Sequence, residues 1–137
     1  MISSGPLEDR LAIRELIDSY NDAVMRFDGE AWAANWTEDA TWTLPGLGDV
    51  NGRNNVVERW QGAMSAFSFV GFFASAGPIV VDGDKARGTW YQQEFLHQKD
   101  GVKRNITGQY TDDYVKRDGR WFFRKRVYQI LNAEESR

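Results

Sequence analysis

The first part of the chain has the hydrophobic spacing of an amphipathic helix. Apolar residues recur at steps of three and four positions after Gly5-Pro6, where proline suits the first turn of a helix. Charged residues occupy the other side, so we expect one face to be buried and the other to meet water. The predicted apolar stripe consists of Ile13, Leu16, Ile17, Tyr20, Val24 and Phe27.

Two shorter helices and a strand are predicted next. Trp32 and Trp36 are four residues apart, as on one side of a short helix, and residues 40–44 have strand composition. Residues 45–52 are rich in glycine and include a proline, which predicts a loop. We expect Asn54 or Asn55 to cap a third helix, whose apolar positions are Val56, Val57, Trp60 and Met64.

From residue 67 onward the pattern is that of antiparallel strands. Asp-Gly pairs separate several of the runs, and such a pair between alternating segments is a strong hairpin signal. Helices followed by strands predict an α+β domain, with three N-terminal helices packed on one face of a curved, mostly antiparallel sheet. We expect the polar residues 132–137 to fray. The predicted strands are residues 67–73, 79–81, 86–97, 105–116 and 121–131.

Composition narrows the possible functions. The 137 residues are expected to form a single domain, 1–137. The absence of cysteine excludes disulfides and thiolate sites, and a single histidine, His97, argues against a zinc site or a Ser-His-Asp triad. A net charge of -3 argues against nucleic acid. Because no signal segment or membrane-length apolar run is present, we expect a cytoplasmic protein that does not contact membranes.

Several segments resemble a known superfamily. Ala12–Tyr20 and Trp36–Ala40 look like the opening of proteins similar to nuclear transport factor 2, and Tyr110–Val115 with Asp118–Trp121 resembles their closing hairpin. The chain is similar to the SnoaL-like branch of that superfamily, to scytalone dehydratases and to hexachlorocyclohexane dehydrochlorinases, which Trp42–Gly48 resembles in particular. The resemblance implies a cone-shaped pocket, no cofactor or metal, and a homo-oligomer, either a dimer or a trimer.

The dehydratases and dehydrochlorinases of this superfamily use an Asp-His pair, in which the imidazole takes a proton and the carboxylate orients it. The resemblance places the aspartate position on Met25 and the histidine position on Phe73. Neither side chain accepts or relays a proton. Similarity to ketosteroid isomerase places that enzyme's oxyanion-donor tyrosine on Tyr20, its second donor near Asp113 and its base on Leu44, so the base is missing there too.

Alternation in the strand 86–97 puts Trp90, Gln92, Glu94 and Leu96 on one face and Tyr91, Gln93, Phe95 and His97 on the other. Both faces have mixed composition, so the residues leave open which face lines the pocket. The resemblance places Gln92, Glu94 and Leu96 in the pocket. Under that register His97 points outward and is a surface or interface residue.

The last strand carries a second set of candidates. Alternation puts Phe122, Arg124, Arg126, Tyr128 and Ile130 on one face and Trp121, Phe123, Lys125, Val127 and Leu131 on the other. The resemblance places Arg126 and Tyr128 on the pocket wall. A buried guanidinium requires a carboxylate or a bound anion. Glu94 is therefore the candidate partner, with Asp112 or Asp113 as substitutes. An arginine exposed at the mouth of the pocket, or an ion pair with a purely structural role, remains an alternative.

These residues suggest carboxylate chemistry. Glu94, partly desolvated among Trp42, Trp90 and Phe73, would act as a general base or acid, while Arg126 and Tyr20 or Tyr128 would stabilise negative charge. The expected pocket residues are Met25, Trp42, Leu44, Phe73, Trp90, Gln92, Leu96, Tyr110, Asp113 and Tyr128.

Three function classes remain open. The first is a cofactor-independent lyase or isomerase that acts on a small hydrophobic, cyclic molecule by elimination, isomerisation or hydration. The second is a protein that binds such a molecule without catalysis. The third is an assembly module similar to the small subunits of ring-hydroxylating dioxygenases.

Overall fold

The computed structural model describes residues 1–137 and contains three helices and six strands. The strands form one sheet in the order β2-β1-β6-β5-β4-β3, in which only β1 and β6 pair in parallel. The predicted α+β class, with three helices on a curved and mostly antiparallel sheet, is therefore confirmed. The elements are α1 (Leu7–Met25), α2 (Gly29–Ala33), β1 (Trp36–Leu44), β2 (Gly48–Asn51), α3 (Arg53–Met64), β3 (Phe67–Asp82), β4 (Lys85–Gln98), β5 (Lys103–Arg117) and β6 (Arg120–Ser136).

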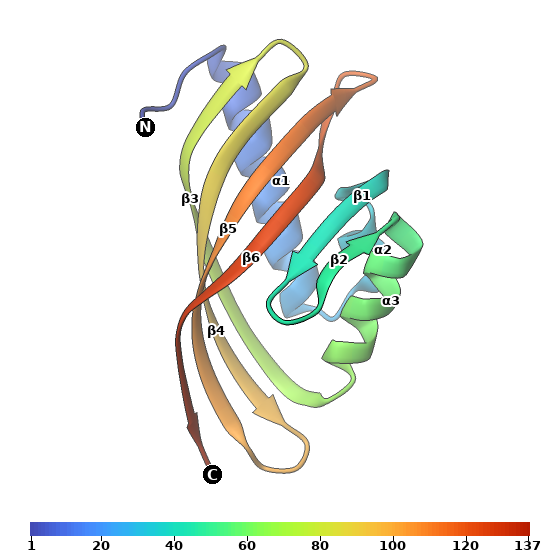
Figure 1. The fold of residues 1–137 in the computed structure, drawn as a ribbon, viewed down its shortest axis with the longest axis vertical. Helices are drawn as coiled ribbons and strands as arrows, with labels where there is room; N and C mark the ends of the chain where they lie inside the picture. Colours follow the sequence, from blue (N-terminus) through green and yellow to red (C-terminus); the bar gives the residue numbers. More distant parts are fainter.

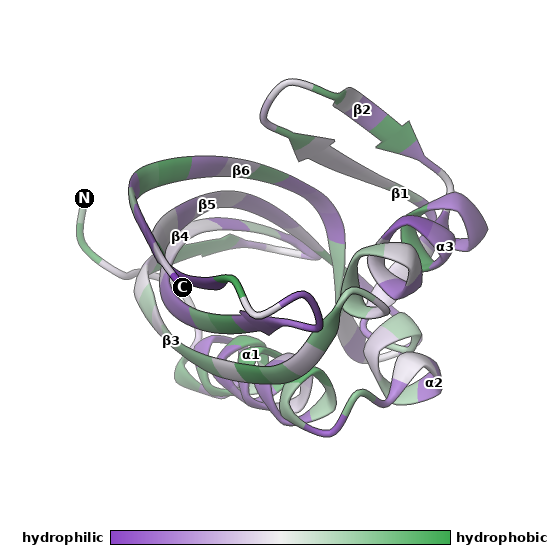
Figure 2. Cartoon of the chain, turned by 90° about the horizontal axis from the view of Figure 1, so that it is seen from below, coloured by the Kyte–Doolittle hydropathy of each residue, from purple (hydrophilic) through white to green (hydrophobic).

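The four long strands β3 to β6 curve strongly, and the helices cover their concave side. In Figure 1, α1 crosses the long strands, while α2 and α3 lie beside the β1–β2 hairpin. Figure 2 shows the strands as an arc seen from below. Helix α1 packs mainly on β3 and α3 packs on β1. We call the helix-covered side of the sheet the inner face and the opposite side the outer face.

Helix α1 buries the predicted stripe except for its last member. Ile13, Leu16, Ile17, Tyr20 and Val24 are buried, whereas Phe27 is exposed and has a left-handed φ of 54°. The helix ends at Met25, so Phe27 lies beyond the last turn.

Helix α3 begins earlier than predicted, and the cap prediction is wrong. The capping position is Gly52, with a φ of 86°, and no side chain bonds to the first turn. A glycine suits this left-handed backbone, so Asn54 and Asn55 fall inside the helix.

The region before α3 corrects two further predictions. Trp36 begins β1 rather than ending a helix, because α2 is a single short turn of five residues. Residues 48–51 form β2 and not a loop. Polar side chains join the two strands: the Thr41 hydroxyl is 3.0 Å from Asn51 Oδ1, and Thr43 Oγ1 is 2.6 Å from Asp49 Oδ1.

The long strands are more continuous than predicted. Residues 67–73 and 79–81 belong to one strand, β3, which is interrupted by a bulge between Ala76 and Ile79. Pro78 lies in this bulge, and proline is tolerated there because β3 is the edge strand. The C-terminal residues do not fray, since β6 pairs with β5 as far as Ser136.

A bulge in β6 changes which residues share a face. Asp113 pairs with Lys125 and Tyr114 pairs with Phe123, so Arg124 is an extra residue. Phe123 therefore lies on the inner face together with Arg126, and the alternation predicted for the start of this strand is wrong.

The three Asp-Gly turns connect β3 to β4, β4 to β5 and β5 to β6, as predicted. Gly83, Gly101 and Gly119 have φ values of 61°, 94° and 77°, which glycine adopts without a Cβ clash. None of the helices is both long enough and apolar enough to cross a membrane.

Candidate functional site

A partly open cavity of about 190 Å³ lies between the inner face of the sheet and the ends of α1 and α3. Thirteen of its 15 lining residues are hydrophobic. The groove along α3 is lined mainly by polar side chains, so the apolar cavity is the better candidate for an apolar ligand. The cavity is lined by Tyr20, Val24, Trp42, Leu44, Trp60, Ala63, Met64, Phe67, Val70, Phe72, Gln92, Glu94, Leu96, Tyr110 and Tyr128.

The polar side of the cavity is a hydrogen-bonded group that spans β4 and β6. Glu94 Oε1 accepts hydrogen bonds from the Tyr128 hydroxyl, at 2.9 Å, and from Gln92 Nε2. Gln92 Oε1 in turn accepts one from Trp90 Nε1, also at 2.9 Å. Glu94 Oε2 accepts no hydrogen bond from the chain. One carboxylate oxygen is thus held in place while the other remains available.

Burial is the main influence on the protonation of Glu94 and Tyr128. It raises the pKa of Glu94, and the hydrogen bonds from Tyr128 and Gln92 and the charge of Arg104 only partly oppose that rise. Burial and the neighbouring Glu94 carboxylate raise the pKa of Tyr128. Tyr128 therefore stays a hydrogen-bond donor, and Glu94 keeps its proton to a higher pH than an exposed glutamate does.

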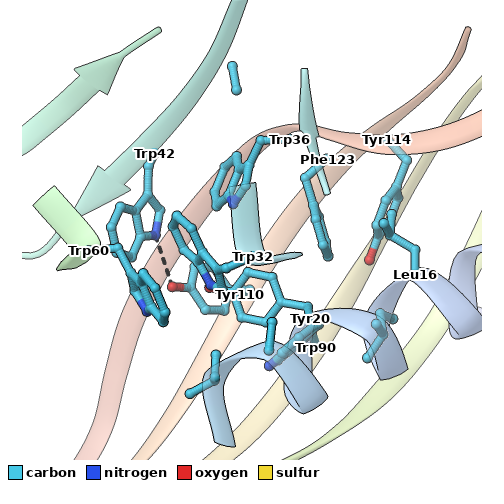
Figure 3. Packing of buried hydrophobic residues seen from close by; sticks show 14 of the residues in the cluster. Leu16, Tyr20, Trp32, Trp36, Trp42, Trp60, Trp90, Tyr110, Tyr114 and Phe123 are labelled. Carbon is cyan, nitrogen blue, oxygen red and sulfur yellow. Dashed lines mark hydrogen bonds between the residues drawn. The ribbon is translucent and has the colours of Figure 1, made fainter. Parts of the chain in front are cut away.

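Two further tyrosines line the cavity from other elements. The Tyr110 hydroxyl of β5 accepts a hydrogen bond from Trp42 Nε1 of β1 at 2.9 Å, drawn as a dashed line in Figure 3. Tyr20 of α1 packs edge-on against Trp90, with 5.1 Å between ring centroids. Burial raises the pKa of both tyrosines, so both hydroxyls are neutral.

Arg126 lies outside the cavity lining, enclosed on all sides. It is 0% exposed, and its Nε and Nη2 atoms lie 2.7 and 3.2 Å from the two carboxylate oxygens of Asp112. The Tyr114 hydroxyl donates to Asp112 Oδ2 at 3.1 Å. Burial opposes the charge of Arg126, but Asp112, Tyr20 and Tyr110 together outweigh burial and raise the pKa of the guanidinium. Four rings surround the guanidinium, those of Tyr20, Trp90, Tyr110 and Phe123, at 3.6 to 4.8 Å.

Comparison with known proteins agrees with this architecture. Residues 5–127 match the SnoaL-like domain family. The chain belongs to that family. The predicted superfamily is therefore confirmed.

A curated relative of this SnoaL-like chain is γ-hexachlorocyclohexane dehydrochlorinase from Sphingobium indicum, 29% identical over 128 residues, which are 86% of this chain and 80% of that protein. Among solved structures, a hexachlorocyclohexane dehydrochlorinase from Novosphingobium barchaimii has a TM-score of 0.82 at 22% identity and covers 95% of this chain and 91% of its own. A candidate scytalone dehydratase from Novosphingobium aromaticivorans has a TM-score of 0.87 at 22% identity, with 96% and 89% covered.

The SnoaL-like chain brings together most of the residues expected at the pocket. Glu94 is in the cavity wall, and the open question about the strand 86–97 has an answer: Gln92 and Leu96 face inward, while His97 is half-exposed on the outer face, 5.1 Å from the ring of Phe69. The other expected residues found in the lining are Tyr20, Trp42, Leu44, Tyr110 and Tyr128.

Two positions carried over from the Asp-His pair need correction. Phe73 is 62% exposed and pairs with Gln93 on the outer face, and its neighbour Phe72 faces the cavity instead. Met25 is 40% exposed at the end of α1, and its Sδ accepts a hydrogen bond from the backbone N–H of Phe72 at 3.1 Å. Neither Met25 nor Phe73 lines the cavity.

Three further expectations also need correction. Arg126 does not line the cavity, because the rings around it separate it from that space, and its partner is Asp112, the expected substitute for Glu94. Asp113 follows Asp112 along the strand, so alternation turns it to the exposed outer face. Trp90 is fully buried behind the cavity wall, where it donates a hydrogen bond to Gln92 and packs against the rings of Tyr20 and Tyr110.

Sequence reasoning missed part of the apolar wall. Trp60 and Met64 form part of the predicted stripe of α3, and Val24 part of that of α1, but a stripe does not indicate which members pack against other side chains and which border an empty space. The missed lining residues are Val24, Trp60, Ala63, Met64, Phe67, Val70 and Phe72. No cluster of three side chains suited to a metal ion is present.

Proposed function

We propose that this SnoaL-like protein binds a small, mainly apolar molecule with a single ring in its cavity, and that Glu94 moves a proton in an elimination, isomerisation or hydration reaction. The observation that carries the proposal is the position of Glu94. It is the only acidic side chain in an apolar wall, with Oε1 held by two donors and Oε2 without one. Such an arrangement is typical of a catalytic carboxylate.

The size of the cavity supports a ligand with one ring. A cavity of about 150 Å³ lined by apolar side chains holds benzene, and the cavity here has about 190 Å³. A steroid would not fit without movement of α3 or of the β1–β2 hairpin. The names of the relatives, a dehydrochlorinase and a candidate dehydratase, support elimination among the three reaction types.

In an elimination, Glu94 Oε2 would accept a proton from a ligand carbon. The electron pair of the broken C–H bond forms a carbon–carbon double bond, and a leaving group on the next carbon departs with its bonding electrons. The raised pKa of Glu94 makes its carboxylate a stronger base than an exposed glutamate. The neutral hydroxyls of Tyr20 and Tyr110 are the groups placed to donate to negative charge that develops on the ligand.

A second candidate function is binding without catalysis. Met25 and Phe72 meet where the N–H of Phe72 bonds to the Met25 sulfur, and no imidazole is near the cavity. A protein of this kind would bind the same ligands as the proposed enzyme and leave them unchanged.

We also propose a homo-oligomer. Four aromatic side chains are exposed on the outer face of β3 and β4, namely Phe69, Phe73, Tyr91 and Phe95. Exposed rings grouped on one face are typical of contact surfaces. Light scattering coupled to size exclusion should give a mass of two or three chains, whereas a single chain at all concentrations would contradict this part of the proposal.

A thermal-shift assay tests ligand binding. Phenol, cyclohexanol, chlorocyclohexane and γ-hexachlorocyclohexane serve as probes with one ring, and testosterone as a probe that is too large. A ligand at 100 times its Kd stabilises the fold by about 2.7 kcal/mol, which raises Tm by several degrees. Shifts with one-ring probes that disappear in Ala63→Phe, which fills the rim of the cavity, would support the proposal. Equal shifts with all probes, or none, would contradict it.

Turnover separates the two candidate functions. Each probe that binds is incubated with the protein, and products are followed by gas chromatography and chloride release. Product formation that is lost in Glu94→Gln, while binding remains, supports catalysis by Glu94. Binding without any product favours the non-catalytic function.

A further inference from the structure

Gly108 occupies an unusual place for a glycine. It lies inside β5, which is flanked on both sides by other strands, on the inner face of the sheet. Its φ is not in the left-handed region, so the backbone itself does not require glycine. A glycine inside a strand weakens the strand, and its presence there often indicates that another group approaches closely.

The group that approaches is the ring of Tyr128. A Cβ atom on residue 108 would lie 2.2 Å from the Tyr128 hydroxyl oxygen, 2.4 Å from Cε1 and 2.5 Å from Cζ. These separations are far shorter than van der Waals contact. The tip of the Tyr128 ring therefore rests directly on the backbone of Gly108.

This contact lies on the path between β6 and β4. Tyr128 is opposite Tyr110 on β5, whereas Gly108 is opposite Ile130 on β6 and Gln92 on β4. The Tyr128 ring thus lies across β5 at Gly108, and its hydroxyl reaches Glu94 Oε1 on β4 at 2.9 Å. Any side chain at position 108 would occupy this path.

We propose that Gly108 is a positioning residue of the cavity, which leaves the space that Tyr128 needs to cross β5 and hold the Glu94 carboxylate. This inference rests on the proposed function of Glu94. It adds that the hydrogen bond from Tyr128 of β6 to Glu94 of β4, which passes over β5, depends on a missing side chain and not only on the two residues that form it.

The hydrogen bond from Tyr128 can be followed through the pKa of Glu94, because few other titratable groups lie near that carboxylate. The titratable groups that face it across the cavity are Tyr20 of α1, Tyr110 of β5 and Tyr128 of β6. Arg104 of β5 acts on it by charge. The lining residues from α3, β1 and β3 do not titrate. Because Tyr128 donates to the carboxylate, loss of that bond raises the pKa of Glu94 further.

The test is an NMR titration of the Glu94 side-chain carboxyl carbon in the full chain without ligand. We expect Gly108→Ala to raise the titration midpoint of Glu94 as much as Tyr128→Phe does, and the double variant to show no further rise. Gly62→Ala, at a glycine of α3 with open space around its Cβ position, is the matched control and should leave the midpoint unchanged.

A wild-type midpoint in Gly108→Ala, or a further rise in the double variant, would overturn the proposal. A second measurement does not depend on a variant that folds: the wild-type protein should show strong nuclear Overhauser contacts between the Tyr128 ring protons and the Gly108 Hα protons, and their absence would also overturn it. Because neither experiment uses a ligand, the results stay separate from the binding test of the proposed function.

Discussion

Two carboxylates on neighbouring strands of the inner face have opposite surroundings. Asp112 of β5 faces the Arg126 guanidinium at 2.7 Å, and both side chains are 0% exposed. Glu94 of β4 has neutral donors, Tyr128 and Gln92, and borders a cavity.

The difference separates a structural charge from a candidate catalytic one. Asp112 and Arg126 bind each other through two hydrogen bonds and are enclosed by aromatic rings, while the buried Arg126 Nη1 has no hydrogen-bond partner. Neither side chain lines the cavity. Glu94 has no cation in contact and has empty volume beside it. Tyr110 divides the two regions: its ring lies 3.6 Å from the guanidinium, and it also lines the cavity.

Arg126→Met, which removes the cation from the buried pair, should cause the largest loss of stability. The variant leaves Asp112 buried without a cation, and breaking a buried pair in this way costs about 3–5 kcal/mol. Urea unfolding followed by tryptophan fluorescence measures the loss. The double variant Arg126→Met/Asp112→Leu should recover most of it, because apolar side chains replace the whole pair. A loss below about 1 kcal/mol in the single variant would contradict the enclosed pair.

Glu94→Gln tests whether the Glu94 carboxylate takes part in catalysis. Removal of a general acid or base lowers a rate by about 10²–10⁴-fold, so we expect at least the lower figure for any reaction found among the cyclic probes. Glu15→Gln, at an exposed position of α1, is the control and should leave the rate unchanged. An unchanged rate in Glu94→Gln would contradict a catalytic role.

The same Glu94→Gln variant should change how stability depends on pH. Burial raises the pKa of Glu94, so the neutral form is favoured in the fold and ionisation destabilises it. The Tm of the variant should exceed that of the wild type increasingly as pH rises through the raised pKa, and the difference should be smallest below about pH 4. A difference independent of pH would show that Glu94 titrates as it does in the unfolded chain.

Tyr110→Phe tests the hydrogen bond at the residue that lies between the cavity and the buried ion pair. The change keeps the ring over Arg126 but leaves the buried Trp42 Nε1 without its acceptor. An unsatisfied buried donor costs about 1–3 kcal/mol, measurable by thermal or urea unfolding. Tyr91→Phe, on the exposed outer face, is the matched control and should stay within about 0.5 kcal/mol of the wild type. Equal effects in the two variants would contradict the buried bond.

The smallest expected effect is that of Arg104→Gln. Arg104 pairs with Glu135 at 3.8 Å near the surface, and exposed pairs contribute about 0–1 kcal/mol. The charge of Arg104 lowers the pKa of Glu94, so the variant should raise the NMR midpoint of Glu94 with little loss of stability. Lys103→Gln, at the preceding position on the outer face, is the control and should leave the NMR midpoint of Glu94 unchanged. A shift in both variants would indicate a general charge effect.

Local patterns predicted most of the fold. The stripe of α1 from Ile13 to Val24 follows from the helical period, and the three Asp-Gly turns follow from the left-handed backbone that tight hairpins need. In β6 the prediction failed because the alternation of inward and outward side chains changes part-way along the strand. The extra residue Arg124 in β6 turns Phe123 to the inner face, and a period of two cannot reveal a bulge in advance.

The site was less accessible to sequence reasoning. Glu94, Gln92 and Tyr128 were identified through a resemblance, but a shift of one residue separates Phe72 in the cavity from the exposed Phe73. The partner of Arg126 depends on which of Asp112 and Asp113 faces inward. Apolar residues that line a cavity have the same sequence pattern as those that fill the core, so the sequence could not distinguish the two groups.

A crystal structure of the protein grown with saturating phenol would show whether the cavity is the ligand site. We expect a ring inside the cavity between α3 and β4, with its hydroxyl at hydrogen-bond distance from Glu94 or from one of the cavity tyrosines, and an unchanged Asp112–Arg126 pair. A cavity filled by repacked side chains, or phenol bound only at the surface, would contradict this expectation.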